Sequence, residues 1–130
     1  MIAIIDYGLG NSGSIRNMLK KIGVESSITA DEAVIRSADK LIIPGVGAFD
    51  EGMKQIESLK LKPLLDELVL EQKVPVLGIC LGMQLFCKSS EEGVRPGLGW
   101  IDAECRRFRL DASQTHLRVP HMGWNTVRSS

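Results

Sequence analysis

The chain has 130 residues, of which 44% are hydrophobic and 25% are charged, a composition that suits one compact domain with a real core. Basic and acidic residues number 16 each, so the formal net charge is zero and gives no electrostatic footprint for nucleic acid or an anionic membrane. No apolar run approaches transmembrane length, and the apolar start meets Asp6 too soon for a signal peptide. The three cysteines contain no C-x-x-C pair and fit neither a disulfide framework nor a zinc site. We therefore expect a cytoplasmic protein without metal or cofactor.

The first third of the chain alternates between short apolar runs and helical patterns. Residues 2–7 (IAIIDY), the weaker run 25–29 (ESSIT) and residues 40–45 (KLIIPG) are expected to form strands. Between the first two, Ile15, Met18, Leu19 and Ile22 recur at helical spacing; Ser12 or Ser14 is the expected cap and Gly23 the expected end. A short helix is expected over residues 32–36.

The second half continues the alternation. Leu61, Leu64, Leu65 and Leu68 form an apolar helical stripe, with Pro63 tolerated in its first turn. Residues 74–79 (VPVLGI) form a continuously apolar run, typical of a parallel strand covered on both faces. Strands that alternate with helices predict an α/β fold with three layers, a mostly parallel central sheet flanked by helices, over a single domain 1–130. Further short strands are expected in 103–110 (AECRRFRL), 115–120 (THLRVP) and 124–127 (WNTV).

Residues 8–13 (GLGNSG) match G-x-G-x-x-G after a strand and before a helix, and Asp31 follows at about the spacing of a dinucleotide-binding fingerprint. Two features oppose this interpretation. Asp6 would place a carboxylate near a bound pyrophosphate, and the second strand is poor in large apolar residues. A dinucleotide-binding domain that uses Gly8–Gly13 stays an alternative from another functional class; a plain tight turn is the simpler interpretation.

Cys80 lies between Gly78 and Gly82, directly after an apolar run, which is the shape of a nucleophile elbow with cysteine in the serine position. A strand that turns sharply into a helix pushes the central side chain outward, and bulky neighbours two residues away would clash. At a helix N-terminus the dipole favours the thiolate, and the amide of Leu81 points to where an oxyanion would form. Gln84 lies one helical turn further along the same face. A buried, unreactive Cys80 is the competing interpretation.

Residues 44–47 (PGVG) follow the strand that we expect beside VPVLGI in the sheet. A glycine-rich loop at this place could supply a second backbone N–H to the same oxyanion.

Together with these motifs, DYGLGN (6–11), PGVGAF (44–49), GICLGMQL (78–85), SEEG (90–93), GLG (97–99) and VPHMGWN (119–125) resemble the triad-type glutamine amidotransferases. The resemblance runs from Asp6 to Asn125. Within that family it is closest to the glutaminase subunits of imidazole glycerol phosphate synthase, in histidine biosynthesis.

The resemblance implies that Cys80 attacks the side-chain amide of glutamine and forms a glutamyl thioester, which water hydrolyses. It also implies an oxyanion hole at Gly47 and Leu81, and substrate contacts at Gly45, Gln84 and Glu92. Ammonia would pass directly to a (β/α)8-barrel synthase subunit, where it would complete an imidazole ring. Asn11, His121 and Trp124 would face that partner, although a core position is an equally plausible interpretation of Trp124.

The family's triad also needs a histidine and a glutamate spaced H-x-E. His116 is followed by Leu-Arg and His121 by Met-Gly, so neither matches. We therefore expect this chain to be the N-terminal portion of a longer amidotransferase, inactive by itself because nucleophile and base act as a unit. Two alternatives remain: a paralogue that feeds ammonia to a sugar-modifying partner in surface-polysaccharide synthesis, and a binding module that has lost catalysis.

Overall fold

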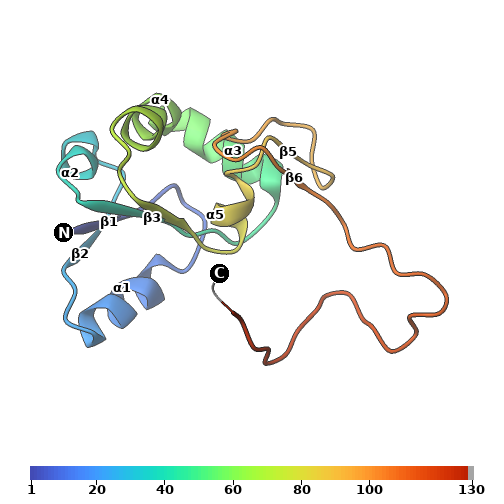
Figure 1. The fold of residues 1–130 in the computed structure, drawn as a ribbon. Helices are drawn as coiled ribbons and strands as arrows, with labels where there is room; N and C mark the ends of the chain where they lie inside the picture. Colours follow the sequence, from blue (N-terminus) through green and yellow to red (C-terminus); the bar gives the residue numbers. More distant parts are fainter. Residues whose placement is uncertain (129–130) are drawn as a thin grey trace.

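The computed structural model describes residues 1–128 of the chain (Figure 1). In chain order the elements are β1 (Ile2–Ile5), α1 (Ser12–Lys21), β2 (Ser26–Thr29), α2 (Glu32–Arg36), β3 (Lys40–Ile43), α3 (Phe49–Ser58), α4 (Leu61–Asp66), the π-helical turn η1 (Glu67–Glu71), β4 (Val76–Gly78), α5 (Leu81–Gln84), β5 (Ser89–Ser90) and β6 (Glu104–Cys105). The expected alternation of strands and helices is therefore confirmed through α5.

Four strands form a parallel sheet in the order β2-β1-β3-β4. Helices lie on both of its faces, which confirms the three-layer α/β class. Figure 1 shows α1 below the sheet and α2, α3 and α4 above it. A separate pair, β5 and β6, is also parallel and lies beyond α5 along the chain.

The strand order separates this fold from the dinucleotide-binding fold. In that fold the third strand of the chain lies beyond the second, on the same side of the first. Here β3 pairs directly with β1, on the side opposite to β2. The order of the strands reverses between β1 and β3, and in open α/β sheets ligands bind outside the carboxyl ends of the strands at such a point.

The main core lies between the sheet and the helices above it. Ala3 and Ile5 of β1 and Leu41 and Ile43 of β3 point into it and are almost completely buried. The helices contribute apolar side chains at helical spacing: Phe49, Met53 and Ile56 from α3, and Leu61, Leu64, Leu65 and Leu68 from α4 and η1. The predicted leucine stripe is confirmed, because all four leucines are buried against the sheet.

The other face of the sheet is covered only in part. Ile4, Ile42 and Leu77 are neighbours in register across β1, β3 and β4, and so they share that face. Ile4 is 0% exposed, Ile42 6% and Leu77 56%. The exposure increases toward β4 because α1 packs mainly on β1 and β2. The expectation that both faces of the 74–79 strand are covered is therefore wrong for the described residues. Met18 of α1 is likewise 63% exposed.

The caps of the first two helices are asparagine and aspartate. The side chain of Asn11, and not that of Ser12 or Ser14 as expected, caps α1 by accepting the Ser14 N–H at 3.2 Å. Asp31 caps α2 by accepting the Val34 N–H at 3.0 Å. Short oxygen-bearing side chains at this position satisfy amides that have no partner inside the helix. The expected end of α1 at Gly23 is confirmed by its positive φ of 76° just after the helix.

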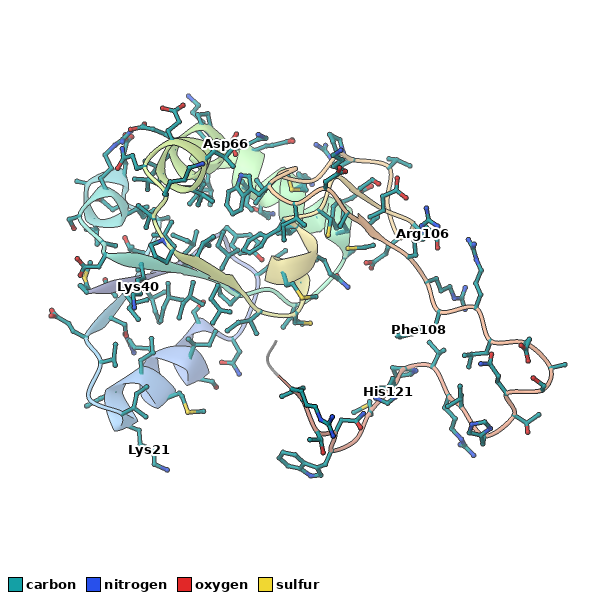
Figure 2. The ribbon with its side chains drawn as sticks, in the orientation of Figure 1. Lys21, Lys40, Asp66, Arg106, Phe108 and His121 are labelled. Atoms are coloured by element: carbon teal, nitrogen blue, oxygen red, sulfur yellow. The ribbon has the colours of Figure 1, made fainter. Side chains whose placement is uncertain are left out.

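Of the three strands expected after Gly99, only Glu104–Cys105 forms, as β6. Residues 115–120 and 124–127 contain no strand, so these two predictions are wrong. Their backbone has no neighbouring strand to pair with among the described residues, and a single run of chain cannot satisfy its own strand hydrogen bonds. Residues 106–128 contain no helix or strand and form an extended C-terminal segment, on which Figure 2 shows Phe108 and His121. These two side chains line a small cavity of about 100 Å³ together with Leu110, Leu117, Arg118 and Val119.

Among the helices described, none is both long and apolar enough to cross a membrane.

Several surface carboxylates have a lowered pKa in the folded protein. Hydrogen bonds from Arg36 lower the pKa of Glu67, the amides of Val94 and Arg95 lower that of Asp50, and the amide of Arg107 lowers that of Glu91. In each case the folded pKa lies below the unfolded value, so the folded state binds fewer protons near pH 4. These groups therefore stabilise the fold above their unfolded pKa, and that contribution is lost as the pH falls through the lowered one.

We expect the melting temperature to fall steadily below about pH 4.5, the ordinary range of Asp and Glu. Replacing Glu67 with Gln should remove part of this acid dependence, because Gln does not titrate and keeps only one of the two acceptor oxygens that bind Arg36 at 2.8 and 2.9 Å. Thermal denaturation of both proteins between pH 7 and pH 3 measures the effect. A melting temperature that stays constant or rises over that range would contradict this prediction.

Candidate active site

Cys80 and the 44–47 loop, which are predicted to carry the chemistry, lie together with Tyr7 at the carboxyl ends of three neighbouring strands. Tyr7 follows β1, the 44–47 loop follows β3, and Cys80 follows β4. Because β1, β3 and β4 are parallel and adjacent, these ends meet at one edge of the sheet. The candidate site is therefore assembled from segments that are more than 30 residues apart in the chain.

Cys80 has the backbone conformation of a strained elbow. Its φ of 55° and ψ of −117° lie in a region that residues other than glycine rarely adopt, at a cost of about 1–3 kcal/mol. Hydrogen bonds on both sides hold this conformation: Ile79 N–H donates to the Ile43 carbonyl at 3.0 Å, and Met83 N–H donates to the Cys80 carbonyl at 3.1 Å. The Cys80 side chain is exposed to solvent, so the interpretation of a buried cysteine is wrong.

The two glycines that flank Cys80 allow α5 to lie directly on the sheet. A Cβ at Gly82 would lie 1.8 Å from the Ile43 carbonyl oxygen, and a Cβ at Gly78 would lie 2.5 Å from Cα of Met83. Real side chains do not approach backbone atoms so closely. The expected need for small residues at both positions is confirmed, and the cause is the contact between α5 and the ends of β3 and β4.

The glycine-rich loop after β3 packs against the elbow. Gly45 is buried, and a Cβ there would lie 2.7 Å from the Gly82 nitrogen and 2.7 Å from Cβ of Leu81. Gly47, two residues further on, is exposed and has a φ of 123°, which favours glycine. Strand β3 pairs with β4, as expected from the sequence.

Two backbone N–H groups after β3 and β4 have no hydrogen-bond partner among the described residues. Within residues 1–128, the N–H of Leu81 and that of Gly47 have no hydrogen-bond acceptor. Leu81 is the first residue of α5, where the amides of a helix lack partners in the helix itself. The structure thus brings the predicted oxyanion residues, Gly47 and Leu81, to the same edge of the sheet.

Sequence reasoning missed the role of Tyr7 in this arrangement. The Tyr7 side chain is fully buried, and its hydroxyl donates to the Pro44 carbonyl at 2.5 Å. A Cβ at Gly45 would lie 2.6 Å from that hydroxyl, so tyrosine and loop are tightly packed. Burial, with a smaller contribution from the nearby Cys80, raises the pKa of Tyr7 well above its usual value, so the phenol stays protonated. The only signal in the sequence is a bulky aromatic residue directly after the first strand.

A pocket of about 570 Å³ lies beside α5. Two predicted substrate contacts, Gln84 and Glu92, are among its lining residues, which also include Ser90, Glu91, Cys105, Arg106, Arg107 and Arg109. Cys80 and Gly45 do not line this pocket. Gln84 N–H donates to the Cys80 carbonyl at 3.2 Å, so the pocket begins one helical turn from the cysteine.

Cys87 and Cys105 are half-buried beside this pocket, and both bond the Gln84 carbonyl. The Cys87 amide donates to that oxygen at 3.0 Å, and Sγ of Cys105 lies 3.7 Å from it. Burial, followed by the neighbouring Cys87 thiol, raises the pKa of Cys105 to about 11.

The residues predicted to face a partner are exposed. Asn11 lies at the start of α1, whereas His121 and Trp124 lie on the extended C-terminal segment. Trp124 is fully exposed, so its interpretation as a core residue is wrong. Nδ2 of Asn125 lies 3.0 Å from Nε2 of His121.

The structure does not favour a nucleotide site at Gly8–Gly13. The side chain of Asp6 accepts the Gly8 N–H at 3.2 Å and so occupies an amide of this loop. The Asp31 carboxylate, which would bind the ribose in a dinucleotide site, instead caps α2. Among residues 1–128, no group of three or more His, Cys, Asp or Glu side chains is arranged to hold a metal ion.

Substitution of Gly82 by Ala should destabilise the protein by about 3 kcal/mol, because its methyl group would overlap the Ile43 carbonyl. Gly13, in the first turn of α1, has open space around it and serves as the control. Its replacement by Ala should be neutral or stabilising by up to about 1 kcal/mol. Urea unfolding of the two variants measures the difference; equal stabilities would contradict the packing described for α5.

At pH 8 we expect iodoacetamide to modify Cys80 well before Cys105. Cys80 is exposed, whereas a pKa of about 11 leaves roughly one Cys105 thiol in a thousand ionised at this pH, and the thiolate is the reactive form. Mass spectrometry of timed samples reads the order of modification, and Cys80→Ser should remove the fast phase. Equal rates at the two cysteines would overturn the prediction.

Comparisons with known proteins agree with this geometry. The chain matches the family described as "Glutamine amidotransferase class-I" over residues 3–129. It is 52% identical over 130 residues to "Imidazole glycerol phosphate synthase subunit HisH 2" of Methanococcus maripaludis, covering 100% of this chain and 63% of the relative. It is 43% identical over 129 residues to "Imidazole glycerol phosphate synthase subunit HisH" of Leptospira interrogans, covering 99% and 63%.

Among solved structures, one described as "Crystal structure of glutamine amidotransferase" superposes with a TM-score of 0.68 at 21% identity, over 82% of this chain and 57% of that one. That likeness supports the fold. The chain spans about 63% of the length of the two curated relatives. The match to the family extends over nearly every residue, and the chain belongs to the class-I glutamine amidotransferases.

Proposed function

We propose that the protein to which this chain belongs is the glutaminase subunit of an imidazole glycerol phosphate synthase. Sγ of Cys80 attacks the side-chain amide carbon of glutamine and forms a tetrahedral intermediate. That intermediate expels ammonia, whose third hydrogen comes from the thiol, and leaves a glutamyl thioester. Water then hydrolyses the thioester to glutamate and restores the thiol.

The observation that carries the proposal is the exposed Cys80 at φ 55°, followed directly by the Leu81 N–H, which has no acceptor among the described residues; the Gly47 N–H, equally unpartnered there, belongs to the loop that packs against the elbow. Residues with backbone strain of this size cluster at active sites, where the surrounding structure holds them in place. Two N–H groups in place before the reaction stabilise an oxyanion without reorganisation, the largest single contribution in many enzymes of this chemical type. The description of the matched family supports glutamine as the substrate.

Glutamine is proposed to lie along α5, with its amide at Cys80 and its amino-acid end in the neighbouring pocket. Gln84 and Glu92 line that pocket, and the Glu92 carboxylate suits a substrate ammonium group. Gly45 contributes by letting the loop approach the elbow.

The ammonia is proposed to pass to a (β/α)8-barrel cyclase subunit in a cytoplasmic heterodimer, and the exposed Asn11, His121 and Trp124 are proposed contacts with it. The combined reaction would close an imidazole ring. Neither histidine of these 130 residues stands in an H-x-E pair, so the proposal applies to the full-length protein with its partner, and this chain alone is proposed to be inactive.

In the full-length complex, Cys80→Ala should lower the turnover of glutamine by about 10³-fold or more, because no other described side chain is presented at the elbow. Cys87→Ala, on the same side of the molecule, serves as the matched control and should retain most of the activity. Coupled detection of glutamate measures both. Full activity in Cys80→Ala would overturn the proposed nucleophile.

The choice of partner is tested separately. Stimulation of glutaminase activity by a cyclase that acts on a ribonucleotide supports the histidine pathway. Stimulation only by a sugar-modifying barrel protein would instead support a paralogue in surface-polysaccharide synthesis.

A further inference from the structure

Asp50, in the first turn of α3, joins that helix to the segment that carries Glu92. Its carboxylate accepts the Arg95 N–H at 2.9 Å and the Val94 N–H at 3.1 and 3.0 Å through its two oxygens. These contacts cross 44 and 45 residues of chain, so they are tertiary contacts and not local turn bonds.

At Gly93 the segment lies so close to Asp50 that a side chain there would displace the Asp50 carboxylate. A Cβ at Gly93 would lie 2.1 Å from Oδ1 of Asp50. Hydrogen bonds to an ionised acceptor are about twice as strong as neutral ones. The amides of Val94 and then Arg95 lower the pKa of Asp50, which keeps the acceptor ionised at neutral pH.

A second contact ties the same segment to the same helix. The guanidinium of Arg95 donates to Glu57 of α3 at 2.7 Å. By contrast, the only hydrogen bond recorded for Glu92 in the described chain is from its own amide to the Ser90 hydroxyl, at 3.2 Å. Glu92 lies between two anchored stretches: before it, the Glu91 N–H donates to the Cys105 carbonyl at 2.9 Å, and after it, Asp50 holds Val94 and Arg95.

Helix α3 begins two residues after Gly47. One helix therefore connects the glycine-rich loop that packs against the Cys80 elbow to the segment that brings Glu92 to the pocket shared with Gln84. A shift of the 92–95 segment relative to α3 changes the distance between these two parts of the site.

We propose that Asp50 is a positioning residue for glutamine binding, which holds Glu92 at the pocket by fixing the amides of Val94 and Arg95 to α3. The inference rests on the proposed function, in which Glu92 contacts glutamine. Asp50 itself touches neither the substrate nor Cys80, so its effect is on the KM for glutamine and not on the chemical step.

The experiment uses the full-length protein in complex with its cyclase partner and measures steady-state glutaminase kinetics. Asp50→Ala should raise the KM for glutamine about tenfold, the loss expected for charge-assisted hydrogen bonds, while kcat changes less than about threefold. Loss of folded protein alone would lower the apparent kcat and leave KM unchanged, so the split separates positioning from general stability.

The matched control is Glu51→Ala, the next residue of α3. Glu51 carries the same charge in the same helical turn, but its contacts, with Gln55 at 2.7 Å and Lys54 at 3.7 Å, stay within the helix. Its KM should stay at the wild-type value. Asp50→Asn keeps the oxygen that accepts both amides and should give a KM between wild type and Asp50→Ala; it also serves if the alanine variant does not fold.

Suppose that the activity of the complex depends on Cys80 but that both Asp50 variants have the same KM as Glu51→Ala. That result would overturn the role of Asp50 and leave the proposed function intact. A fall in kcat at constant KM would also overturn that role. If the wild-type complex shows no glutamine hydrolysis dependent on Cys80, the proposed function fails first and this inference falls with it.

Discussion

The contact of α5 with the ends of β3 and β4 is the constraint on which the candidate site depends. Gly82 lies against the Ile43 carbonyl at a distance that excludes any side chain, and Gly78 lies against the backbone of Met83, where a Cβ would also overlap. This contact forces the chain to turn sharply between them, and the strain falls on Cys80. Hydrogen bonds and packing on both sides over-determine the turn, which is how a strained residue persists in a folded protein.

The rest of the site is arranged around this elbow by two side chains outside it. The Tyr7 hydroxyl donates to the Pro44 carbonyl and fills the space next to Gly45. Asp50 bonds the segment after Glu92. A buried hydrogen bond therefore holds the glycine-rich loop and charged hydrogen bonds hold the 92–95 segment, so the geometry of the candidate site does not depend on loop conformation alone.

Local patterns in the sequence predicted most of the elements through α5, because each pattern reports the burial of one face of its own segment. The leucine stripe and the buried run of β3 are examples. Prediction failed where pairing or coverage by distant residues decides the outcome. Residues 115–120 and 124–127 have strand-like composition but no partner strand, and Trp124 is exposed although tryptophan is usually packed. The cap at Asn11 was missed because several adjacent polar residues suit the same position.

The sequence by itself determined the alternating α/β class, the Gly-Cys-Gly elbow and, through motifs spread along the chain, the family. All of these depend on residue types at short spacings. Only the tertiary structure decided that the Tyr7 hydroxyl bonds the Pro44 carbonyl, that Asp50 anchors Val94 and Arg95, and that Leu77 is exposed to solvent. These facts follow from which strands and loops become neighbours, and residues 37 to 45 positions apart carry no local pattern that encodes such contacts.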